Sequence, residues 1–369
     1  MLLRPGLFFF FNWIILFAFD ELLMYVEPTF YPVEYSVYFY ALTVSLFVLM
    51  GGRASNFFFA HNVQRLVFIP VFIVQEIMRA RSWIFILTFI FLVTGLERYL
   101  MVGAEWYTPD GVNAYRYMVT EDGENRLFSL LNYFNFFIFF SGAYLVYFYE
   151  KISLKQKILF VILLCALLYI NSARSTAFFV ILISLFVYLL SYGFKVWMIY
   201  IPFVLIALFI FIGAISGKDD PFSFVTYYLA PIHAFSELFV DSVPLGENYQ
   251  LLSFRFLHSL FVDLGIIDNP AIMLPYIETP LPTNVYTALY VYWHDLGWYS
   301  FIFWFVMGFL FDLTYRWYVR SKCFSSIAML SMLLTCIVLS VFYDYFTSSA
   351  FVYVSAFILI ALNSSSRKI

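Results

Sequence analysis

Long apolar segments alternate with short polar ones along almost the whole chain. They fall at about 7–26, 33–51, 83–97, 127–149, 158–170, 177–192, 196–215, 284–314, 327–343 and 348–362. A helix needs roughly 20 apolar residues to cross about 30 Å of hydrocarbon, and it satisfies its own backbone hydrogen bonds there. The pattern therefore predicts an all-α, polytopic integral membrane protein with about ten transmembrane helices in a single transmembrane domain, 1–369.

One apolar segment, 66–78, does not fit this pattern. Arg65 precedes it, Arg79 and Arg81 follow it, and Pro70 interrupts it. Basic residues at both ends favour an interfacial or re-entrant segment that returns to the same face. Whether it spans the membrane stays open at this point.

The composition agrees with a membrane protein. Of 369 residues, 64% are hydrophobic and only 12% are charged, against roughly 25% charged residues in soluble domains. No basic run points to nucleic acid as a partner. The three cysteines lie in two apolar segments and one basic segment, which argues against a disulfide framework.

Lysine and arginine in short connecting segments indicate the orientation, because they concentrate on the cytoplasmic side. Such residues are Lys151, Lys155, Lys157, Arg316, Arg320, Lys322, Arg367 and Lys368. Counting segments from these positions predicts that both termini are cytoplasmic. The segments 98–126, 171–176, 216–283 and 344–347 then lie outside.

The segment 216–283 is too long for a simple connection, since most connections run about 4–6 residues. Apolar runs alternate in it with seven prolines, Pro221, Pro231, Pro244, Pro270, Pro275, Pro280 and Pro282. We expect a large periplasmic loop with short amphipathic helices on the outer rim of the helix bundle.

Arg174 lies in the polar stretch 171–176, between two apolar segments that are each short for a membrane span. Joined as one helix, 158–192 would exceed the membrane thickness at about 1.5 Å per residue, so the chain must turn at 171–176. Arg174 is then an external cation near headgroup level. It either extends toward lipid phosphates at a helix end or neutralises a departing diphosphate, a role that suits the bidentate guanidinium.

Arg255 and His258 are three residues apart and would share one helix face. They form either a pair facing a pocket or the polar stripe of an amphipathic helix. A histidine with a pKa of about 6.5 can take a hydroxyl proton at neutral pH.

In the shorter outer segment, Tyr115 and Arg116 combine an aromatic face with a cation, which fits a sugar-binding surface or an interfacial aromatic belt.

Two aspartates complete the candidate residues. Asp295 would lie inside an apolar segment unless Gly297 breaks it, and ionisable residues at depth usually face a cavity. Asp344 lies at the outer end of another segment. No Walker-type glycine-rich loop and no zinc-ligand spacing of histidines is present, so the sequence indicates neither ATP-driven export nor a zinc site.

The sequence resembles the O-antigen polymerases (the Wzy family), polytopic bacterial enzymes of surface-polysaccharide synthesis. The resemblance rests on the stretch 171–176 between short spans, on 227–235 early in the large outer loop, and on 284–287 leading into Asp295 and Gly308. It covers most of the chain in topology, while the motifs are short and degenerate.

The resemblance implies a fold like the GT-C membrane glycosyltransferases in the bacterial inner membrane and a part in lipopolysaccharide biosynthesis. The substrate would be an undecaprenyl-diphosphate-linked oligosaccharide, whose glycan is transferred to another lipid-linked repeat unit on the periplasmic face. By position, Arg174 and Arg255 match the essential arginines described for the external loops of this family. Together with His258 and Asp295, which the residues themselves suggest, they are the candidate catalytic residues. The candidate substrate-binding residues are Arg116, Tyr115, Asn284, Tyr286 and Asp344. Membrane lipids and a chain-length regulator protein are the implied partners, and the resemblance implies no metal or other cofactor. A flippase or transporter for the same lipid, an O-antigen ligase and a structural subunit are the alternatives.

Overall fold

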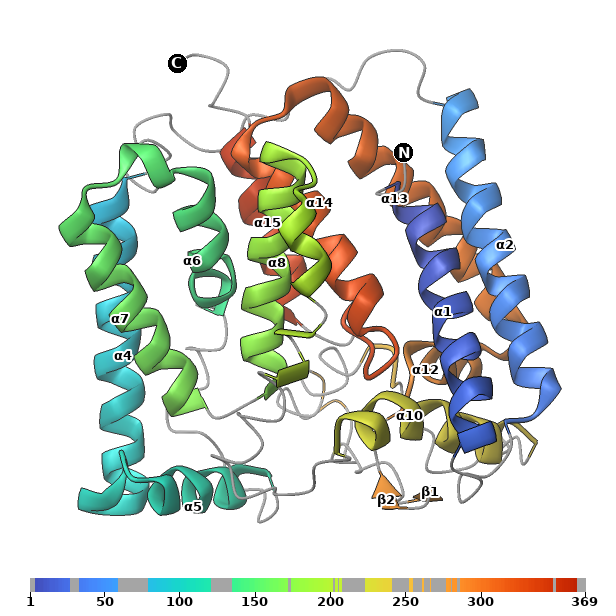
Figure 1. Ribbon diagram of the computed structural model, residues 1–369, viewed down its shortest axis with the longest axis horizontal. Coiled ribbons are helices and arrows are strands. Elements are labelled where there is room, and N and C mark those ends of the chain that lie inside the picture. The colour runs from blue at the N-terminus through green and yellow to red at the C-terminus, as the bar shows by residue number, and fades with distance from the viewer. Residues whose placement is uncertain are drawn as a thin grey trace. The chain divides into compact units, whose positions relative to one another are not determined.

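The computed structural model describes residues 4–26, 33–58, 79–120, 135–171, 174–201, 203–204, 206–207, 223–240, 252–254, 261, 266, 277–279, 281–283, 286–347 and 350–363. The chain forms two compact units. The first unit comprises Met1–Gln64, Phe224–Lys322 and Met332–Tyr353, and the second unit comprises Arg65–Ser223, Cys323–Ser331 and Val354–Ile369. Figure 1 shows the helices of both.

The first unit is built on α1 (Pro5–Val26), α2 (Tyr35–Phe58), α10 (Ser223–Val240), α12 (Ala288–Leu296) and α13 (Ser300–Ser321). It also holds the last part of α14 (Phe324–Leu339), the first residues of α15 (Ala350–Asn363), and the antiparallel pair β1 (Ile277–Thr279) and β2 (Leu281–Thr283). In Figure 1, α10 and α12 lie at the end of α1 that is distant from the N-terminus.

Helices α2 and α13 pack with their backbones in direct contact. A Cβ on Gly51 would lie 1.9 Å from the carbonyl oxygen of Phe305, and a Cβ on Gly308 would lie 2.0 Å from that of Val48. Small residues permit this close approach between membrane helices, where packing replaces the hydrophobic driving force. The glycines of α2 and α13 therefore permit the close approach of these two helices.

The second unit contains α4 (Ala80–Val102), η1 (Gly103–Glu105), α5 (Pro109–Thr120), α6 (Asn135–Tyr147) and η3 (Tyr149–Lys151). These are followed by α7 (Leu154–Asn171), α8 (Arg174–Tyr192) and η4 (Val196–Tyr200). Its core includes a stack in which the ring of Tyr144 lies 4.6 Å from that of Trp83 and 6.0 Å from that of Phe160, measured between centroids.

Part of the chain has the length and apolar character of membrane spans. Among the described residues, the segments Pro5–Leu22, Tyr35–Ser55, Ala80–Glu105 and Ala288–Ser321 are long and apolar enough to cross a bilayer. Their outer faces expose large apolar side chains, such as Ile15, Phe39 and Phe85, which is costly in water and favourable in lipid. The described chain is helical apart from the short hairpin β1–β2, which the sequence pattern did not indicate.

Two details refine the sequence-based picture. The expected break at 171–176 is present, because α7 ends at Asn171 and α8 begins at Arg174. The predicted single segment 284–314 is divided, because Gly297 adopts a left-handed conformation with φ of +51° and separates α12 from α13. A residue without a Cβ adopts this conformation readily.

Candidate functional site

Asp295 is held at the C-terminal end of α12, where Gly297 ends the helix. One carboxylate oxygen accepts hydrogen bonds from the backbone N–H of Ser253 (2.6 Å) and from its hydroxyl (2.5 Å). The other oxygen lies 2.9 Å from Nδ1 of His294. Asp295 is buried, and these contacts compensate for its removal from water.

Asp344 lies in the connection between α14 and α15 and is completely buried. Its carboxylate accepts hydrogen bonds from the Tyr292 hydroxyl (3.0 Å) and the Phe346 backbone N–H (2.8 Å). Burial raises the pKa of Asp344 to about 6, although these donors oppose the rise. The group is thus ionised at neutral pH and takes up a proton in mild acid.

Ser253 connects the two aspartates. Its backbone N–H and hydroxyl bind Asp295, while its carbonyl oxygen accepts from the hydroxyl of Thr347. That hydroxyl also lies 3.0 Å from a carboxylate oxygen of Asp344. We call Ser253, Tyr292, His294, Asp295, Asp344 and Thr347 the Ser253 network. Two candidates chosen from the sequence therefore belong to one polar cluster, through a serine that sequence reasoning overlooked.

A second buried acid lies in the first unit. A carboxylate oxygen of Asp20, on α1, is 2.8 Å from Nε2 of His233, on α10. The other oxygen accepts from the hydroxyl of Tyr38, on α2, at 2.7 Å. Asp20 and His233 are 0% and 1% exposed. Sequence reasoning missed this pair, although an ionisable residue inside an apolar segment is itself a signal of function.

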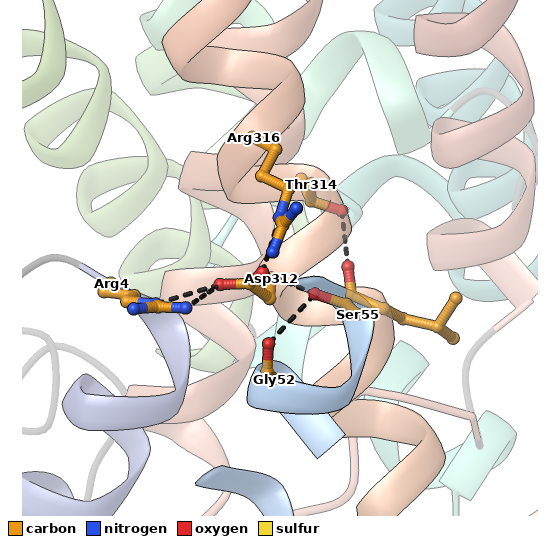
Figure 2. Close-up of polar contacts among 7 residues, drawn as sticks. Arg4, Gly52, Ser55, Asp312, Thr314 and Arg316 are labelled. Atoms are coloured by element: carbon orange, nitrogen blue, oxygen red, sulfur yellow. Dashed lines mark hydrogen bonds and ion pairs between the residues drawn. The ribbon is translucent and has the colours of Figure 1, made fainter. Parts of the chain in front are cut away.

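Figure 2 shows a charged cluster around Asp312 on α13. Arg4 contacts one carboxylate oxygen at 2.6 Å, and Arg316 contacts the other at 2.7 Å. Ser55, on α2, lies 2.5 Å from that second oxygen. The N-terminal arginine and Arg316, which begins the basic segment 316–322, therefore lie close together in the first unit.

The Ser253 network lies toward the N-terminal end of α13. Tyr292 packs on Trp304 with ring centroids 5.0 Å apart, and α13 begins at Ser300. Asp312 lies about two helical turns beyond Trp304, which is about 12 Å along the helix. The basic cluster and the Ser253 network are thus at different levels along α13.

In the second unit, a basic residue and a candidate site residue lie at opposite ends of one helix. Lys155 lies at the start of α7 and Arg174 follows the end of this helix, about 25 Å away. The Tyr169 hydroxyl, near the end of α7, donates to the carbonyl oxygen of Tyr107 at 3.1 Å. Tyr107 lies just before Thr108 and α5, which contains Tyr115. Arg174 and Tyr115 therefore belong to the same end of the unit.

Tyr115 and Tyr286 are both buried in the structure. The guanidinium of Arg98 lies 4.3 Å from the ring centroid of Tyr115, a cation–π contact. Tyr286 stacks on Tyr290 at a centroid distance of 4.6 Å. Only the backbone positions of Arg174 and Arg116 are described, at the start of α8 and within α5.

Arg255, His258 and Asn284 lie outside the described residues, as does the segment 66–78. Within the described part of the chain, no cluster of three histidine, cysteine or acidic side chains could hold a metal ion.

Comparisons with protein-family models, with curated proteins and with solved structures give no match for this chain.

Proposed function

We propose that this protein is a membrane glycosyltransferase that polymerises lipid-linked O-antigen repeat units. It would transfer the growing glycan from undecaprenyl diphosphate to the sugar end of another lipid-linked repeat unit, on the periplasmic face of the bacterial inner membrane. The proposal includes about ten spans, a GT-C-like arrangement and cytoplasmic termini.

The observation that carries the proposal is the position of the Ser253 network. It joins two buried aspartates close to the N-terminal end of α13, whereas the basic cluster of Arg4, Asp312 and Arg316 lies further along this helix. Basic residues favour the cytoplasmic side, so the network belongs on the outer side. Arg255 follows Ser253 by two residues, which brings a candidate cation into the sequence neighbourhood of both acids.

Arg174 supplies the second part of the proposal. It begins α8, and the first backbone N–H groups of a helix have no acceptor within the helix. Together with a guanidinium, these donors suit the oxygens of a diphosphate. The end of α7 that precedes Arg174 is opposite to Lys155, so the same charge rule puts Arg174 outside.

The reaction follows from these groups. The acceptor hydroxyl oxygen attacks the anomeric carbon, and the bond from that carbon to the diphosphate oxygen breaks, with its electron pair leaving on the diphosphate. Asp295, Asp344 or His258 takes the hydroxyl proton. Arg174 and Arg255 stabilise the negative charge on the leaving group, and loss of one such donor typically reduces the rate about 10²–10³-fold.

Substitution of Arg174 tests this role. We expect Arg174→Ala to abolish polymer while lipid-linked single repeat units accumulate, and Arg174→Lys to retain part of the activity if charge suffices. Arg320→Ala is the matched control, because Arg320 is exposed at the basic end of α13. Normal chain lengths from Arg174→Ala, at normal protein level, would refute the proposed role.

One observation favours a second function, a proton-coupled transporter of the lipid-linked oligosaccharide. The buried pair of Asp20 and His233, with Tyr38, resembles in chemistry the proton relays of transporters. Asp20→Asn separates the two functions. A transporter loses transbilayer movement of the lipid with this substitution and forms no glycosidic bonds at any stage, whereas a polymerase forms them.

A further inference from the structure

A pocket of about 460 Å³ lies in the second unit. It is lined by Arg79, Ala80, Arg81, Tyr144, Phe148, Lys151, Ile152 and Gln156. These residues come from the start of α4, the end of α6, η3 and the start of α7. Its volume is within the range of about 300–1,000 Å³ that is typical of ligand sites.

The pocket has a basic rim. Three of its lining residues, Arg79, Arg81 and Lys151, are cations with exposed side chains, and none of the described lining residues is acidic. Arg79 precedes α4 without capping it through its side chain, and the first turn of α4 carries no acidic residue. The helix therefore adds the positive end of its dipole to the charge of the rim.

The floor of the pocket is aromatic and apolar. Tyr144 and Ile152 are 2% and 5% exposed, and Tyr144 is fixed in a stack with Trp83. The ammonium group of Lys151 lies 5.9 Å from the ring centroid of Phe148. An apolar floor under a cationic rim suits a ligand with a phosphate at one end and hydrocarbon at the other.

We propose that this pocket binds a phosphate group, carried by the headgroup of an anionic phospholipid or by a soluble anion. The position favours the lipid, because the pocket lies where α4 begins a segment long enough to cross the bilayer. Gln156 lies at the end of α7 that is opposite to Arg174, and Lys151 ends η3 just before that helix. This site is therefore separate from the proposed diphosphate site and does not depend on it.

Binding of phosphatidylglycerol and phosphatidylcholine to the purified full-length protein in detergent tests the proposal. We expect the anionic lipid to bind more tightly. Arg79→Gln combined with Arg81→Gln should weaken it about 25-fold, at about fivefold for each cation. Lys155→Gln is the matched control, because Lys155 is exposed nearby and outside the pocket lining, and we expect less than a twofold loss.

Inorganic phosphate distinguishes the two sources of the anion. If phosphate displaces the bound lipid only at a far higher concentration, the ligand is the phospholipid. If inorganic phosphate binds with the same affinity as the lipid, and this affinity depends on the two arginines, the ligand is a soluble anion. Wild-type binding should weaken as salt is raised, which needs no variant. Equal binding of both lipids, or an equal loss in Lys155→Gln and in the double variant, would overturn the proposal.

Discussion

The pH dependence of Asp344 offers a quantitative test of the Ser253 network. Burial raises its pKa from about 3.8 to about 6, which corresponds to about 3 kcal/mol at about 1.4 kcal/mol per pKa unit. The folded protein holds this proton more tightly than the unfolded chain does. The contribution of Asp344 is therefore most stabilising below about pH 4, declines as the pH rises to about 6, and is constant above that.

The perturbation is Asp344→Asn, which removes the titration. We expect the difference in unfolding free energy between wild type and variant to change by about 2.4 kcal/mol between about pH 4 and pH 7, most of the full effect. Chemical unfolding in detergent, followed by tryptophan fluorescence, measures this difference. Asp110→Asn is the control, because Asp110 is exposed on α5 and should leave the pH dependence of the wild type unchanged.

Infrared titration of the carboxyl band, compared with Asp344→Asn, measures the pKa itself. A midpoint near 6 agrees with a buried carboxylate. If the proposed transfer needs this carboxylate in its ionised form, its rate should rise with pH through about 6. A band that titrates near 4, or parallel pH profiles of stability for wild type and Asp344→Asn, would refute the reasoning.

Two further expectations concern packing and charge in the first unit. Gly51→Ala should destabilise by about 2 kcal/mol or more, because the new Cβ would meet the carbonyl oxygen of Phe305. Gly52→Ala, whose Cβ finds its nearest neighbour at 3.5 Å, should be neutral or slightly stabilising, and equal thermal unfolding of the two variants would contradict this packing. Asp312→Asn should destabilise the protein by about 2 kcal/mol, because it removes the buried charge that Arg4 and Arg316 contact. The effect is limited to this size because Arg4 is 39% exposed and its contact is partly screened by solvent. A double-mutant cycle with Arg4→Met measures this coupling, and additive effects would show that the pair contributes nothing.

The helices could be predicted from the sequence because membrane spans depend on the length of apolar runs, which is a local property. The break before Arg174 followed from the same arithmetic. A break at Gly297 was considered only in connection with the depth of Asp295, because a glycine within an apolar run does not indicate which φ angle it adopts. The hairpin β1–β2 has strands of three residues among prolines, too short for any periodic signal.

The site was harder to predict because its contacts join residues that are distant in sequence. Asp295 and Asp344 were chosen individually, but Ser253, which links them, is a common residue type with no local signal. Asp20 and His233 are 213 positions apart, and only the packing of α10 against α1 brings them together.

Reconstitution of the purified protein with undecaprenyl-diphosphate-linked repeat units tests the proposed polymerisation most directly. Without ATP or added metal, we expect glycans longer than one repeat unit to form on the lipid carrier, with release of one undecaprenyl diphosphate for each bond made. Transbilayer movement of intact substrate without new glycosidic bonds, or transfer of glycan only to lipid A core, would contradict the proposal.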